Sequence, residues 1–124
     1  MVKGKSVVLD TNVLIYFFAG NDNAGEAVRQ YSNVISAITI IELLSGKKQT
    51  VKERELIKDF LTGLTAFQTT PFINEVAIKF RLSYNLTVTD AIIAATAKYL
   101  DMPLITSDTA FFKIKEIEII PFTK

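Results

Sequence analysis

Four acidic residues stand at positions where carboxylates could do chemistry together. Asp10 and Asp108 each come at or just beyond the end of a short apolar run, and Glu42 and Asp90 lie early in stretches that are otherwise apolar. The chain contains no histidine and no cysteine, so it lacks the usual general base at neutral pH and has no thiol nucleophile. Hydrolytic chemistry would therefore depend on carboxylates, lysine or a metal ion.

Asp10 and Asp108 each have a structural interpretation beside the chemical one. Either residue could cap the helix that follows it, because aspartate is a favoured N-cap residue. For Asp10 this interpretation is the weaker one, because Thr11 and Asn12 could cap the same helix. Each acid alone therefore leaves both interpretations open, and their joint placement is the stronger argument.

Glu42 and Asp90 could belong to capping boxes, with Thr39 and Thr87 three positions earlier as the capping residues. For Glu42 taken alone, this structural interpretation is slightly favoured. Asp90 opens a helix that is apolar nearly all round and should be buried, and no basic residue lies within several positions of it. A buried carboxylate needs a partner, for which a metal ion is one candidate.

Bringing these four acids together would be costly without a cation. Two carboxylates ~5 Å apart repel each other by about 3 kcal/mol at an effective dielectric constant of 20. A divalent cation would reverse the sign of that interaction. Mg²⁺ and Mn²⁺ prefer oxygen ligands, and the only softer donors in the chain are two methionines.

The elements that must position these acids alternate along the chain. Strands are expected at residues 6–9, 33–36, 64–68, 104–106 and 116–120. Helices are expected at 12–19, 24–31, 39–44, 50–62, 71–84 and 89–100, with a helical turn at 110–114. Among the caps, Asn23 with Glu26 and Thr50 with Glu53 have capping-box spacing, and Pro71 suits a first helical turn.

Strands that alternate with helices predict an α/β fold with a mainly parallel central sheet flanked by helices. In such sheets, ligands bind in the crevice outside the carboxyl ends of the strands. Asp10 and Asp108 both belong to that face of the expected sheet. A site is therefore expected there.

Length and composition set the class of protein. The 124 residues suit one domain with one core, and 49% apolar with 22% charged residues is typical of a globular chain. The net charge of +1, from 14 basic and 13 acidic residues, neither supports nor excludes nucleic acid as a partner. No signal peptide and no membrane-spanning run is recognisable, so a soluble, cytoplasmic protein is expected.

The segments around the four acids resemble the PIN-domain nucleases, specifically the VapC-like toxins of type II toxin–antitoxin systems. The matching segments are VVLDTNVLIYF, SAITIIELLSG and LTVTDAIIAATAKYLDMPLITSD. They occur in the family's order and at similar spacing, and the resemblance spans essentially the whole chain. It implies a single PIN-like domain over residues 1–124 with a three-layer fold.

The resemblance also implies a site and a reaction. The reaction is the metal-dependent endonucleolytic hydrolysis of RNA, with Mg²⁺ or Mn²⁺ as the cofactor. The implied metal ligands are Asp10, Asp90 and Asp108, and Glu42 would bind the metal through water or position the nucleophile. Polar supports for these catalytic acids would be Thr11, Asn12 and Thr106, and Ser107 could contribute similarly.

The partners follow from the resemblance too. They are an RNA substrate, a cognate VapB-like antitoxin and a second copy of the chain in a homodimer, with no membrane. Tyr16 or Phe17, in an aromatic run, is a hypothetical antitoxin contact. Basic residues between positions 47 and 58 could hold phosphates, but a solvated helix face is the favoured interpretation. Arg29, Lys79 and Arg81 are weaker candidates.

Three alternatives compete with this interpretation. A non-catalytic PIN-like module would bind RNA or protein without cutting, although four retained acids argue against it. A haloacid dehalogenase-like phosphatase needs a second acid two residues after the first, where this chain has Asn12. A receiver-like domain usually carries lysine after a late strand, whereas here Thr106, Ser107 and Asp108 occupy that segment.

Overall fold

Five short strands form one sheet in the computed structural model, which describes residues 5–124. Residues 1–4 of the expected domain lie outside this part. The strands are β1 (Ser6–Leu9), β2 (Ser32–Ser36), β3 (Thr65–Phe67), β4 (Leu104–Thr106) and β5 (Ile119–Pro121). Every pairing is parallel and the strand order is β3-β2-β1-β4-β5. The expected parallel α/β fold is confirmed.

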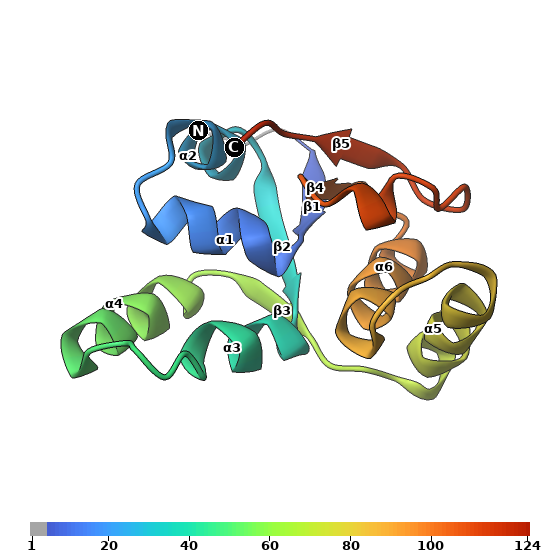
Figure 1. The fold of residues 1–124 in the computed structure, drawn as a ribbon, viewed down its shortest axis with the longest axis horizontal. Coiled ribbons are helices and arrows are strands. Elements are labelled where there is room, and N and C mark those ends of the chain that lie inside the picture. The colour runs from blue at the N-terminus through green and yellow to red at the C-terminus, as the bar shows by residue number, and fades with distance from the viewer. Residues whose placement is uncertain (1–4) are drawn as a thin grey trace.

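Helices cover both faces of this sheet (Figure 1). On one face lie α1 (Thr11–Phe18), α2 (Asp22–Gln30), α3 (Ala37–Leu44) and α4 (Val51–Leu61). On the other face lie α5 (Pro71–Ser83), α6 (Val88–Leu100) and the 3₁₀ turn η1 (Thr109–Phe111). The molecule therefore has three layers, with the sheet in the middle.

The alternation of side chains along each strand divides the core in two. In β1, Val7 and Leu9 pack with α1, α2, α3 and α4, whereas Val8 packs with α5 and α6. Successive strand residues point to opposite faces, so a strand buried on both faces is apolar throughout. This is why short continuous apolar runs form the central strands.

The strand order reverses between β1 and β4. From β1 the chain moves outward to β2 and then β3, crosses to the other face through α5 and α6, and returns beside β1 as β4. The connections that leave β1 and β4 therefore diverge, and they leave a crevice at the carboxyl ends of these two strands. Asp10 and Asp108 follow these two strands.

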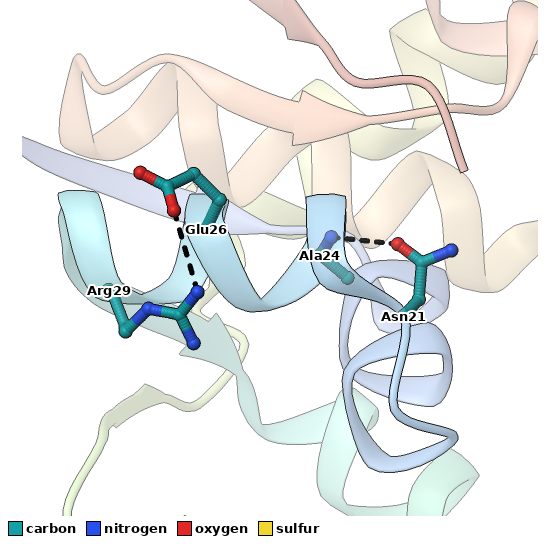
Figure 2. A network of polar contacts seen from close by, with 4 residues as sticks. All are labelled: Asn21, Ala24, Glu26 and Arg29. Atoms are coloured by element: carbon teal, nitrogen blue, oxygen red, sulfur yellow. Dashed lines mark hydrogen bonds and ion pairs between the residues drawn. The ribbon is translucent and has the colours of Figure 1, made fainter.

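The starts of α4 and α5 match the sequence, whereas that of α2 does not. Thr50 and Glu53 form the expected capping box of α4, and Pro71 opens α5. Helix α2 begins two residues earlier than predicted, with the Asn21 side chain accepting a hydrogen bond from the Ala24 N–H (Figure 2). Gly20, with φ +87°, ends the preceding turn, so the chain can re-enter a helix at once. The prediction that Asn23 caps α2 is wrong.

The last strand also differs from its predicted bounds. It includes Pro121, where the sequence suggested an end before proline. β5 lies at the sheet edge and pairs only with β4, and the neighbouring Phe122 N–H donates to the Thr106 carbonyl at 3.3 Å. Proline is tolerated because an edge strand does not need every N–H for its ladder.

Between residues 5 and 124, the chain forms no helix with the length and apolar character needed to cross a bilayer.

Candidate active site

Asp10 occupies the N-cap position of α1 but its side chain does not cap the helix. Instead, its Oδ2 accepts a hydrogen bond of 2.7 Å from the Thr106 hydroxyl, which comes from β4. Only 2% of Asp10 is exposed. Since α1 begins at Thr11, neither Thr11 nor Asn12 caps it, and the capping interpretation of all three side chains is wrong.

The Thr106 hydroxyl joins two of the four acids. It donates to Asp10 and accepts a hydrogen bond of 3.0 Å from the Asp108 N–H. The ends of the two strands are tied directly as well, because the Asp10 N–H donates to the Ile105 carbonyl at 3.0 Å. The parallel register of β1 and β4 therefore sets the distance between the loops that carry Asp10 and Asp108.

Asp108 keeps its structural role and still has a free carboxylate oxygen. Its Oδ1 accepts a hydrogen bond of 2.9 Å from the Ala110 N–H and so caps η1. Among the described residues, Oδ2 has no hydrogen-bond or ion-pair partner. The cap fixes the orientation of the carboxylate and leaves one oxygen for a ligand.

Asp90 sits in the first turn of α6 at the same edge of the sheet. The Thr87 side chain caps this helix, as predicted, by accepting a hydrogen bond of 3.2 Å from the Asp90 N–H. Burial raises the pKa of Asp90, and the charges of Asp108 and Glu42 raise it further, against a lowering contribution from Thr87. Asp90 is therefore coupled to the buried Asp10, the half-buried Asp108 and the exposed Glu42.

Glu42 is held by a relay of hydroxyl groups. The Thr11 hydroxyl donates to Glu42 Oε1 at 2.7 Å and lies 2.9 Å from the Thr39 hydroxyl. A hydroxyl has one proton to donate, so Thr39 must donate to Thr11. Thr39 lies inside α3, whose cap is Ser36, so the predicted capping box of Thr39 with Glu42 is wrong.

Thr39 is a site residue for which the sequence predicted a different role, that of a helix cap. It lies three positions before Glu42, so the two side chains share one face of the helix. The same spacing is also that of a capping box, and only the position of Ser36 decides between the two. Of the predicted supports, Thr11 and Thr106 bond to acids directly, whereas Asn12 has no side-chain partner among the described residues.

The electrostatics of the cluster are those of uncompensated negative charge. Burial raises the pKa of Asp10 from 3.8 to about 7; the Thr106 hydrogen bond opposes this effect, and the charges of Asp90 and Asp108 add to it. Within residues 5–124, the ion pairs are Lys5–Glu118 and Arg29–Glu26. No basic side chain in that part of the chain therefore neutralises any of the four acids.

The donor set fits a hard divalent cation. All the groups are carboxylate or hydroxyl oxygens, as Mg²⁺ and Mn²⁺ prefer, and their repulsion is the kind that a cation relieves. Over the described residues, no three acidic side chains already converge as a metal-binding group. The acids lie near enough to shift one another's pKa without meeting at one point.

Two of the basic candidates have other partners. Arg29 pairs with Glu26 at 3.4 Å on the exposed face of α2 (Figure 2). Arg81 donates through Nε to the Leu86 carbonyl at 3.2 Å and so holds the turn between α5 and α6. These contacts give both side chains structural roles outside the acid cluster.

The aromatic run of α1 is half-buried rather than free. The Phe17 and Phe18 rings pack against each other and against Phe60, with centroid distances of 5.0–5.4 Å. Tyr16 packs edge-on against Phe122, and its hydroxyl accepts a hydrogen bond of 2.7 Å from Lys124. Packing accounts for these residues, and a role in partner binding stays a prediction.

Known proteins share this architecture. A toxin–antitoxin complex from Klebsiella pneumoniae contains a chain 31% identical to this one, with a TM-score of 0.82 over 92% of this chain and 95% of that one. DNA-bound VapBC from Salmonella typhimurium gives 20% identity and a TM-score of 0.81 over 98% of both chains. VapBC-5 from Mycobacterium tuberculosis gives 21% and 0.74, over 94% of this chain and 98% of that one.

No curated protein gives a significant match to the sequence. The family model described as the PIN domain matches residues 7–117. That range runs from β1 to the segment before β5 and includes all four acids. The chain therefore belongs to the PIN domain family, with the three-layer α/β fold expected from its sequence.

Proposed function

We propose that this chain is a divalent-metal-dependent endoribonuclease that hydrolyses RNA phosphodiester bonds. The observation that carries the proposal is the group of four carboxylates near the carboxyl ends of β1, β2 and β4, in which Asp90 is coupled to each of the other three and no acid has a basic partner in residues 5–124. Holding this much like charge together is unfavourable in the free protein. A divalent cation that takes part in the reaction would offset this repulsion.

The four acids have two separate proposed roles. Asp10, Asp90 and Asp108 would hold the metal, with Asp10 fixed by Thr106 and Asp108 by its cap on η1. Bound Mg²⁺ or Mn²⁺ would act as a Lewis acid and lower the pKa of the water that it holds. Glu42, oriented by Thr11, would position the attacking water. Carboxylates in this role substitute for the histidine that the chain lacks.

We also propose that the protein is the toxin of a toxin–antitoxin pair. The 31% identical chain belongs to a structure described as a toxin–antitoxin complex, and the similarity covers nearly all of both chains. The proposed partners are a VapB-like antitoxin and a second copy of this chain. Tyr16 or Phe17 remains the proposed antitoxin contact, and unchanged antitoxin affinity after alanine substitution of both would contradict that detail.

The test is an RNA cleavage assay with a matched pair of variants. Structured RNA is incubated with the chain in Mn²⁺, in Mg²⁺ and in EDTA, and the fragments are separated on a gel. Asp10→Asn should lower the rate by about 100-fold or more, in line with the loss of a catalytic group. Asp101→Asn should leave the rate unchanged.

Asp101 is a suitable control because it lies at the other end of the helix that carries Asp90. Asp101 lies eleven positions after Asp90, which is about 16 Å along a helix axis. Asp101 has φ 53°, and asparagine tolerates that left-handed conformation well. Metal-independent cleavage, or full activity of Asp10→Asn, would contradict the proposed site. Retention of RNA without cleavage would indicate a non-catalytic binding module instead.

A further inference from the structure

Two cavities flank the acid cluster, and they differ in charge. The first, here called the Lys113 cavity, lies beside Asp108 and is lined by the turn between α5 and α6 and by the segment that follows β4. The second, here called the Glu53 cavity, lies beside Glu42 and is lined by α1, α3 and α4. A polyanionic substrate bound at the acids would continue across one of these two cavities.

The Lys113 cavity has the chemistry of a nucleotide subsite. Its volume is about 430 Å³, within the range of ~300–1,000 Å³ usual for small-molecule sites. Ser83, Asn85 and Thr109 line it with neutral hydrogen-bonding groups, and Lys113 is the basic residue in its wall. Within residues 5–124 no carboxylate pairs with Lys113, so its ammonium group is available for a phosphate.

The walls of the Lys113 cavity are fixed before any ligand binds. The Tyr84 hydroxyl donates to the Glu116 carboxylate and accepts a hydrogen bond of 3.3 Å from the Lys115 N–H. These bonds tie the turn after α5 to the segment after η1. On the other side of the same turn, Arg81 holds the Leu86 carbonyl. A preformed cavity costs less ordering when it binds a ligand.

The Glu53 cavity has the opposite character. Its charged residues are Glu42 and Glu53, and most of its remaining wall is apolar, with Ile15, Phe18 and Leu43 among the lining residues. Its volume of about 370 Å³ is similar, so size does not distinguish the two. A phosphate there would meet two carboxylates and no basic residue. The charges therefore favour the Lys113 cavity for nucleic acid.

We propose that the Lys113 cavity holds the RNA nucleotide adjacent to the one cut at the acid cluster, with the Lys113 ammonium group contacting its phosphate. Asp108 belongs both to the cluster and to the wall of this cavity, so a strand can pass from one to the other without a gap. Ser83, Asn85 and Thr109 offer hydrogen bonds to the ribose or the base edge. This inference rests on the proposed ribonuclease function.

The test measures RNA binding apart from cleavage. Asp10→Asn serves as the background so that the probe, a fluorescent single-stranded RNA oligonucleotide, stays intact. Its anisotropy is followed over a series of salt concentrations. Lys113→Ala should weaken binding and reduce the slope of log K against log salt by about 0.7, the loss of one phosphate contact to a single strand. Lys113→Arg should retain the slope.

The matched control is Lys98→Ala, which removes an exposed lysine from the last turn of α6. It should leave the slope unchanged. Equal slopes for Lys113→Ala and Lys98→Ala would overturn the inference, even if the wild-type chain cuts RNA. If the wild-type chain binds RNA through Lys113 but does not cut it in Mn²⁺ or Mg²⁺, the ribonuclease function fails while the binding site stands.

Discussion

Asp10 and Glu42 accept the same kind of hydrogen bond in opposite surroundings. A threonine hydroxyl donates to each carboxylate at 2.7 Å. The Asp10 carboxylate is buried at the junction of β1 and β4, with 2% of the residue exposed. Glu42, in contrast, is exposed on α3. Burial, rather than the hydrogen bond, therefore sets the cost of holding each charge.

The largest difference between the two acids is expected in the pH dependence of stability. In EDTA, native Asp10 retains a proton from pH 3.8 up to about 7 that the unfolded chain has lost. The free energy of unfolding therefore falls as pH rises through that window and stays low above it. Asp10→Asn removes the penalty and should be more stable than wild type at pH 8 by up to about 4 kcal/mol.

Urea unfolding between pH 4 and 8 measures this difference, and Glu42→Gln is the control. Substitution of an exposed carboxylate should change stability by less than about 0.5 kcal/mol. The gain in Asp10→Asn should become small near pH 4, where native Asp10 is protonated and Asp10 of the unfolded chain still holds a proton about half of the time. A gain that is the same at every pH would show that charge burial is not its cause.

Addition of Mn²⁺ should narrow the difference in stability between wild type and Asp10→Asn. A metal that binds the native state stabilises it by about 2.7 kcal/mol at a concentration 100 times its Kd. The wild type should gain this stability, Glu42→Gln should keep most of it, and Asp10→Asn should lose it. Urea titrations with and without Mn²⁺ measure the gain of each protein. Equal gains in all three proteins would place the metal elsewhere.

The two hydroxyl donors should differ by a smaller amount. Thr106→Val leaves the Asp10 carboxylate and the Asp108 N–H without their shared partner in a buried place, and should destabilise the protein by about 2 kcal/mol at pH 8. Thr11→Val should cost about 1 kcal/mol, because water can replace the hydroxyl at the exposed Glu42. Chemical denaturation measures both, and the reverse order would contradict the comparison.

The weakest expected effect is the coupling between Thr39 and Glu42 through Thr11. In a double-mutant cycle of Thr39→Val and Glu42→Gln, the interaction energy should be about 0.5 kcal/mol, at the lower limit for residues in one hydrogen-bond network. Thermal unfolding of the four proteins measures it. Strict additivity would indicate that the hydroxyl relay does not connect the two side chains.

The sequence predicts the central elements well. β1 and β4 are continuous apolar runs, and α6 is apolar nearly all round, because each is buried on more than one side. Such segments have few alternative conformations. The local pattern therefore predicts their bounds, the parallel sheet and the placement of Asp10 and Asp108 at one edge.

What the sequence does not reveal depends on contacts between distant residues. Thr39 and Glu42 have the same spacing in a capping box and on a shared helix face, and the observed Ser36 cap distinguishes them. The availability of Lys113 depends on which carboxylates come near it in three dimensions. The coupling of Asp90 to Glu42 and to Asp108 likewise arises only when α3, α6 and the end of β4 meet.

The hydrogen bond between Thr106 and Asp10 joins residues 96 positions apart. At a synthesis rate of 5–20 residues per second, roughly 5 to 20 seconds pass on the ribosome between the appearance of the first and the second. An incomplete nascent chain therefore carries Asp10 without its partner strand. Under the proposed ribonuclease function, the nascent chain cannot cut RNA until the segment that forms β4 has left the ribosome.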